Sequence, residues 1–66
     1  MWIPEKIKSL RKSYGERQED FCQRLGVALS TLRHWEQGHG EPIGPARKLL
    51  DRLEEDLREG RIKQPA

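Results

Sequence analysis

Two short segments of this chain, residues 18–25 and 29–37, each repeat apolar residues at helical spacing, and only three residues separate them. Gly26 and Gly38 follow directly after the two segments, at the position where helices commonly end in a left-handed residue. The sequence therefore predicts two tightly joined helices whose apolar sides face each other. This pair constrains the fold more than any other feature of the chain.

One further helix is predicted on each side of this pair. Pro4 suits the first position of a helix over about residues 4–14, because the proline ring is pre-organised for that position. Pro45, with Gly44 as its cap, begins a last helix that ends near Gly60. The chain has no strand pattern, so we expect a small all-α domain of four helices. Apolar residues repeat at helical spacing at Ile3, Ile7, Leu10 and Tyr14, and again at Ala46, Leu49, Leu50, Leu53 and Leu57.

The length of 66 residues allows one small domain, assigned to residues 1–60, followed by a flexible tail over residues 61–66. The single cysteine, Cys22, excludes an internal disulfide and indicates a reducing, cytoplasmic setting. No apolar run approaches the ~20 residues that span a bilayer, so no membrane association is predicted. Cys22, His34 and His39 lack zinc-ligand spacing, and no nucleophile–base set is present. We therefore predict neither an enzyme nor a metal or other cofactor.

Charge is distributed unevenly along the chain. Residues 1–48 carry nine Lys and Arg against six Asp and Glu, a net charge of +3, whereas residues 49–60 carry two against five, a net charge of −3. An anionic partner is therefore expected to meet the first two thirds of the chain rather than the last helix.

The predicted helix over residues 29–37 has two different sides. Leu32 and Trp35 fall on the apolar side, which faces the preceding helix. The pair then has the arrangement of a helix-turn-helix, whose second helix enters a DNA major groove. Hydrogen-bonding groups without an apolar partner occupy the outward side, as major-groove readout requires. They are Ser30, Arg33, His34 and Gln37.

Residues 17–38, "RQEDFCQRLGVALSTLRHWEQG", resemble the helix-turn-helix of the Cro/repressor-like (XRE) family. The upstream "IKSLRKSYG" and the downstream "EPIGPARKLLDRL" resemble the first and last helices of that family, so the similarity covers roughly residues 3–57. The resemblance implies a lambda-repressor-like four-helix fold, most similar to small antitoxin-type regulators that are paired with toxins. Its motif positions are Gln18, Phe21, Cys22, Leu25, Gly26, Val27, Trp35, Glu36 and Gly38.

Arg17 and Ala28 depart from the family pattern, which prefers Ser or Thr at both positions to cap the two helices that follow. Losing each cap costs about 0.5–2 kcal/mol, which does not prevent folding. The resemblance also implies a salt bridge between Arg11 of the first helix and Glu36 at the end of the third. The alternative for these two residues is a pair of solvated charges.

The resemblance places three base-reading positions at Ser30, Arg33 and His34. Arg33 suits a bidentate contact with guanine, and its alternative is a plain phosphate contact. Leu29 begins the predicted recognition helix, so we interpret it as packing on a thymine methyl group. The alternative is that Leu29 shields the edge of the core.

Five residues are predicted to contact DNA phosphates. Gln18 opens the second helix, where its amide and the free backbone N–H groups suit a phosphate oxygen. Arg17 is expected to reach a phosphate instead of capping that helix. The alternative for Gln18 is an exposed helix starter, and for Thr31, His39 and Lys12 it is a solvated surface residue. The remaining phosphate candidates are Thr31, His39 and Lys12.

Two functions from different classes remain open. The first is a sequence-specific transcriptional regulator, a repressor, that binds double-stranded DNA at a palindromic operator as a homodimer. The second is a protein-interaction module, such as an antitoxin that covers a partner toxin, with an apolar strip from Leu53, Leu57 and Ile62. Trp2 lies outside the apolar periodicity, which leaves three interpretations: an exposed side chain, a dimer contact, or a lid on the end of the final helix.

Overall fold

The computed structural model describes residues 2–60, and the predicted tail over residues 61–66 lies outside the described part. The described residues form four helices and no strand, which confirms the all-α fold. No helix among them is long and apolar enough to cross a membrane. The helices are α1 (Pro4–Ser13), α2 (Gln18–Leu25), α3 (Leu29–Gln37) and α4 (Gly44–Arg58).

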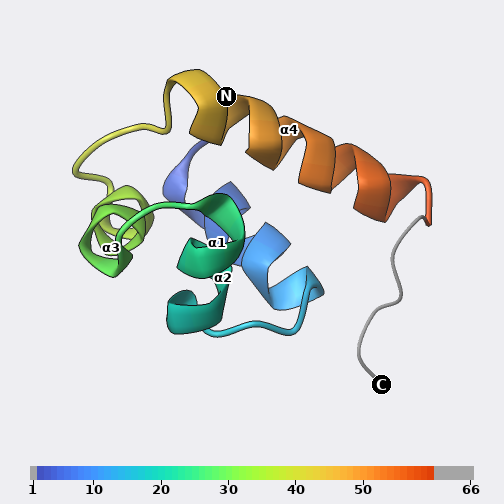
Figure 1. Cartoon of the computed structure of the whole chain (residues 1–66), viewed down its shortest axis with the longest axis horizontal. Helices are drawn as coiled ribbons and strands as arrows, with labels where there is room; N and C mark the ends of the chain where they lie inside the picture. The colour runs from blue at the N-terminus through green and yellow to red at the C-terminus, as the bar shows by residue number, and fades with distance from the viewer. Residues whose placement is uncertain (1, 61–66) are drawn as a thin grey trace.

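The four helices are arranged so that α1 and α2 each contact both α3 and α4. In Figure 1, α4 runs across the top of the molecule, and α3 lies on the side opposite the C-terminal end of α4. The ends of the outer helices differ slightly from the sequence prediction: α1 ends at Ser13 rather than Tyr14, and α4 includes Gly44 and ends at Arg58. The arrangement leaves α3 at one end of the domain.

Both helices of the α2–α3 pair end in a left-handed glycine, and the first of these glycines lies in the short connection between them. Gly26 has φ +71° and Gly38 has φ +83°, a conformation that costs other residues steric strain. The next backbone N–H turns back to the helix in each case, from Val27 to the Cys22 carbonyl at 3.0 Å and from His39 to the His34 carbonyl at 2.8 Å. These bonds satisfy carbonyls that the helix end leaves unpaired.

The core draws on all four helices, as the apolar periodicity predicts. Phe21, Leu32 and Leu50 are fully buried, and the Tyr14 and Phe21 rings contact each other with centroids 6.2 Å apart. Ile3 belongs to the predicted apolar stripe of α1 but precedes the helix as its N-cap and is 47% exposed. The buried apolar residues are Trp2, Ile7, Leu10, Tyr14, Phe21, Cys22, Leu25, Leu32, Trp35, Leu50 and Leu53.

Trp2 is buried against α4, so the structure excludes the exposed side chain among its three interpretations. Its side chain is only 5% exposed, and its indole N–H donates a hydrogen bond of 2.7 Å to Asp51 Oδ1. Lys6 lies over the indole ring at 4.5 Å from the centroid and forms an ion pair of 3.2 Å with Glu54. Trp2 therefore lies along the first half of α4, from Arg47 in its first turn to Asp51.

Candidate nucleic-acid interface

Helix α3 is held by one side and exposed on the other. Leu32 is completely buried and Trp35 is 8% exposed, so these two side chains anchor the helix in the core. Ser30, Arg33 and His34 are exposed on the opposite side. The sequence prediction for the two sides of this helix is therefore confirmed in the structure.

Leu29 lies at the boundary between these two sides. It is partly buried and packs against the hydrophobic core, yet it keeps an exposed portion at the first position of α3. The backbone before it has an extended conformation at Ala28, and no side-chain hydrogen bond caps the helix. Leu29 thus contributes to the core and also borders the exposed face.

Arg11 and Glu36 form a bidentate ion pair between α1 and the last turn of α3. Arg11 Nε donates to Glu36 Oε2 at 2.8 Å, and Nη2 donates to Oε1 at 3.1 Å. A third bond runs from Arg11 Nη1 to the Glu16 carbonyl at 3.1 Å. The Glu36 side chain is only 2% exposed, so this carboxylate depends on protein donors rather than on water.

Gln18 joins the same cluster from the start of α2. Its amide Nε2 donates to Glu36 Oε1 at 3.1 Å. Its carbonyl Oε1 faces Arg33 of α3, whose Nε lies 3.5 Å away. Gln18 therefore contacts the buried Glu36 on one side and the exposed Arg33 on the other, so it is more than the exposed helix starter of the alternative interpretation.

Arg17 precedes α2 as its N-cap residue and makes no capping hydrogen bond through its side chain. The side chain is 78% exposed and lies 3.6 Å from Asp20 in the first turn. A contact this exposed is weak, because solvent screens it and an exposed side chain has many rotamers. Arg17 remains accessible to an anion beside the N-terminus of α2.

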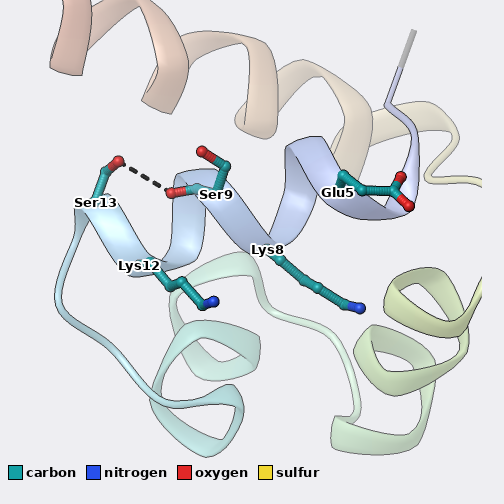
Figure 2. Close-up of a pocket in the computed structure, with 5 residues that line it drawn as sticks. All are labelled: Glu5, Lys8, Ser9, Lys12 and Ser13. Atoms are coloured by element: carbon teal, nitrogen blue, oxygen red, sulfur yellow. Dashed lines mark hydrogen bonds between the residues drawn. The ribbon is translucent and has the colours of Figure 1, made fainter.

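Lys8 and Lys12 lie one turn apart on α1, and both are exposed. Figure 2 shows that both side chains leave α1 on the side turned toward α2 and α3, whereas Ser9 points toward α4. Arg11 follows Lys8 by three residues, so it lies on a neighbouring part of the α1 surface, and its bond to Glu36 directs that part toward α3. A shallow pocket here is lined by Glu5, Lys8, Ser9, Lys12 and Ser13.

The two histidines of the chain lie next to each other beside the end of α3. The His34 and His39 rings are 5.9 Å apart between centroids and meet edge to face, at 74°. Both residues are exposed. Among the residues that the structure describes, no group of three or more His, Cys, Asp or Glu side chains could hold a metal ion.

Arg24 is basic but is engaged within the protein. Its guanidinium donates to both carboxylate oxygens of Glu16, at 2.8 and 2.9 Å, and stacks over the Tyr14 ring at 4.8 Å. The hydrogen bonds from Arg24 hold the pKa of the Glu16 carboxyl below its ordinary value, although burial acts in the opposite direction. Arg24 is therefore less accessible to an anionic partner than Arg17 or Lys12, because its guanidinium is already bound to Glu16.

Two features of this surface were missed in the sequence. Lys8 was overlooked, although its four-residue spacing from Lys12 places both on one helix side. The contact between Gln18 and Arg33 has no sequence pattern, because it joins two helices. The candidate interface thus consists of the exposed side of α3, the N-terminus of α2 and the side of α1 that carries Lys8 and Lys12.

Comparisons with known proteins place this arrangement in a family. A search of curated proteins and a search of solved structures each gave no match. A family model described as helix-turn-helix matches residues 7–59, which is most of the chain and includes the α2–α3 pair. Families of this kind bind DNA. The chain therefore belongs to the Cro/repressor-like (XRE) helix-turn-helix family.

Proposed function

We propose that the protein is a sequence-specific transcriptional repressor whose helix α3 enters the major groove of a palindromic operator. The observation that carries this proposal is the exposure of Ser30, Arg33 and His34 on a helix whose opposite side is fixed in the core. A helix held this way presents hydrogen-bonding groups to base edges with little freedom to reorient.

Base reading is assigned to the first turns of α3. Arg33 suits a bidentate contact with guanine O6 and N7, and Ser30 and His34 supply further hydrogen-bonding groups. The exposed portion of Leu29 suits the methyl group of thymine. Because Leu29 also packs on the core, its removal is expected to change both base preference and stability.

Phosphate contacts are assigned to residues that surround α3 and carry no base information. The exposed Arg17 and the Gln18 amide lie at the N-terminus of α2, where backbone N–H groups also attract anions. Lys12 extends this surface along α1, and the side-chain direction of Lys8 supports adding it to the set. Thr31 and His39 complete the proposed phosphate contacts.

A homodimer follows from the proposed palindromic operator. Two copies related by a two-fold axis would place their α3 helices in successive major grooves, about one helical turn apart. Dimer contacts on DNA would then come from surfaces outside α3.

The test begins with selection of bound duplexes from random DNA, followed by salt titration of the selected duplex and of a scrambled duplex. We expect two symmetric half-sites and a log Kd that changes linearly with log salt, by about 0.9 per neutralised phosphate. Lys12→Gln should lower this slope by about one phosphate contact. Arg58→Gln, at the end of α4 distant from α3 in Figure 1, is the matched control. Equal binding of both duplexes, or no salt response, would contradict the proposal.

Arg33→Ala is the variant that tests base reading. We expect it to lose about 1–3 kcal/mol of discrimination at one base position of each half-site, because the bidentate contact is gone. Arg58→Ala removes an arginine of the same size from the far end of α4 and should leave discrimination unchanged. The measurement is the ratio of Kd values for the selected duplex and single-base variants of it.

An antitoxin-like interaction module is the second candidate. Leu53 is buried in the core, so the predicted apolar strip of Leu53, Leu57 and Ile62 is wrong at its first position, and Ile62 lies outside the described residues. A different feature supports a protein partner: a shallow apolar groove between α1 and α4, lined in part by Ile3, Leu10 and Leu57. None of its lining residues belongs to the proposed DNA contacts.

Co-expression with the product of the neighbouring reading frame tests this candidate. A stoichiometric complex that Ile3→Glu abolishes and Ile43→Glu preserves would support it. Ile3 lines the groove, whereas Ile43 is an isoleucine 78% exposed in the loop before α4, outside the groove. Absence of a complex, or equal loss in both variants, would contradict an interaction through the groove.

A further inference from the structure

Four polar side chains from three helices form a continuous chain that ends on the exposed face of α3. Arg11 of α1 holds both carboxylate oxygens of Glu36, through Nε at 2.8 Å and Nη2 at 3.1 Å. Glu36 Oε1 accepts the Gln18 amide N–H at 3.1 Å, and Gln18 Oε1 lies 3.5 Å from Arg33 Nε. Arg33, a proposed base reader, is therefore the outer end of a chain anchored in the protein.

The chemistry of the two neighbours determines which way the Gln18 amide points. A carboxylate only accepts hydrogen bonds, so Glu36 must face the NH2 end of the amide. A guanidinium only donates, so Arg33 must face the carbonyl end. Glutamate at position 18 would repel Glu36, and lysine would repel Arg33. The amide therefore suits a position between a fixed acceptor and a donor.

The contact with Gln18 involves one part of the Arg33 guanidinium. Gln18 lies at Nε, the nitrogen nearest the helix, which leaves the two terminal nitrogens for other partners. Restricting a flexible arginine before it binds lowers the entropy lost on contact with a base. The 3.5 Å distance is long for a hydrogen bond, so the restraint on free Arg33 is mild.

We propose that Gln18 is a positioning residue that sets the base preference of Arg33. The inference rests on the proposed function, in which α3 enters the major groove. It is compatible with a phosphate contact, because the second N–H of the Gln18 amide has no part in the chain described above. A phosphate contact alone affects all DNA sequences equally, whereas positioning affects discrimination at the base that Arg33 reads.

The experiment is a double-mutant cycle on discrimination. The selected duplex is compared with a duplex changed only at the base pair whose discrimination Arg33→Ala removes. The ratio of the two Kd values is measured for the wild type, Gln18→Ala, Arg33→Ala and the double variant. Both duplexes meet the same folded fraction of one protein, so the ratio does not depend on any stability lost by Gln18→Ala.

The wild-type ratio is expected to be about 5- to 150-fold, the range for a bidentate base contact. Gln18→Ala should lower this ratio at least about threefold, because Arg33 loses its restraint. The double variant should equal Arg33→Ala, since a positioning residue has no effect without the residue it positions. Gln23→Ala removes an exposed glutamine from the same helix and should leave the ratio unchanged.

Two results would overturn the inference, and they are distinguishable. If the wild type discriminates but Gln18→Ala keeps the full ratio, Gln18 does not position Arg33 and only this inference fails. If the wild type shows no preference between selected and scrambled duplexes, the proposed function fails and the inference fails with it. A weaker affinity for both duplexes with an unchanged ratio assigns Gln18 to phosphate contact alone.

Discussion

Two side chains, Leu29 and Tyr14, each make contacts of two different kinds. The sequence leaves two interpretations of Leu29, a thymine contact and a shield for the edge of the core. In the structure Leu29 packs on the core and also borders the exposed face of α3, so its position is compatible with both. Tyr14 behaves similarly: its ring contacts Phe21, while its hydroxyl donates to the Leu53 carbonyl at 2.8 Å.

Tyr14→Phe tests the buried hydroxyl and its pH dependence. Burial raises the pKa of Tyr14 above its ordinary value of 10.0, so the folded state favours the neutral phenol. The stabilisation that the phenol provides is fully present below pH 10 and is lost as pH rises through the raised pKa. Near neutral pH the variant should be less stable by about 0.5–1.5 kcal/mol, from the lost hydrogen bond.

Urea denaturation of wild type and Tyr14→Phe, near neutral pH and again above pH 10, measures this difference. The gap between the two proteins should shrink at the higher pH. A gap that stays constant across the range would show that the hydroxyl does not titrate in the folded state as described.

The helices are joined by a few specific contacts, and their beginnings are poorly capped. None of the four helices has a side-chain capping bond at its N-terminus. Helix α3 depends instead on burial of Leu32 and Trp35 and on the Arg11–Glu36 pair at its last turn. Because Glu36 is buried, removing Arg11 would leave a carboxylate short of donors, which costs more than loss of a surface ion pair.

Ala28→Ser restores a cap to α3 and should stabilise the protein. Ala28 is exposed and has the extended backbone conformation that an N-cap residue adopts, with φ −68° and ψ 150°. A serine hydroxyl there can accept a free backbone N–H of the first turn, for a gain of about 0.5–2 kcal/mol. The gain appears as a higher Tm in thermal melts followed by circular dichroism.

Lys48→Ser is the control for this substitution. It introduces serine at an exposed position inside α4, where serine has a slightly lower helix propensity, so Tm should stay the same or fall. An equal rise of Tm in both variants, or no rise in Ala28→Ser, would show that the missing N-cap of α3 does not reduce the stability of the protein.

At the scale of the whole molecule, α3 and α4 both pack against α1 and α2, with α4 across the top of the view and α3 at one end of the domain (Figure 1). Trp2 and Tyr14 tie α1 to α4 through Asp51 and the Leu53 carbonyl. The uneven charge follows the same division, since residues 49–60 carry a net charge of −3 and residues 1–48 carry +3. The acidic C-terminal part of α4 lies on the side of the molecule opposite α3 (Figure 1).

Leu50→Ala measures how much the fold depends on α4. Leu50 is completely buried, so its truncation is expected to cost about 2–5 kcal/mol through lost burial and the cavity left behind. For a domain of this size that is a large share of total stability. Ile43→Ala, at a residue 78% exposed, should change stability by no more than about 0.5 kcal/mol. Chemical denaturation followed by circular dichroism compares the two, and similar losses would show that α4 does not carry the core.

Much of this structure was readable from the sequence because it depends on local order. Helical spacing of apolar residues and left-handed glycines predicted the bounds of α2 and α3, the four-helix fold and the exposed side of α3, since each depends on residues within a few positions. The shared side of Lys8 and Lys12 on α1 also follows from local spacing, because residues four positions apart lie on one side of a helix. These features need only the geometry of a single helix.

Other features were decided only by the tertiary structure, because they join residues far apart in the chain. Trp2 bonds to Asp51, 49 positions away, and Gln18 lies between Glu36 and Arg33, 18 and 15 positions away. No local periodicity encodes such contacts; they exist only after the four helices have packed. The sequence by itself thus determined the four helices and the two different sides of α3, because both depend on local spacing. The packing of the helices decided which side chains hold α3 and its proposed base reader in place.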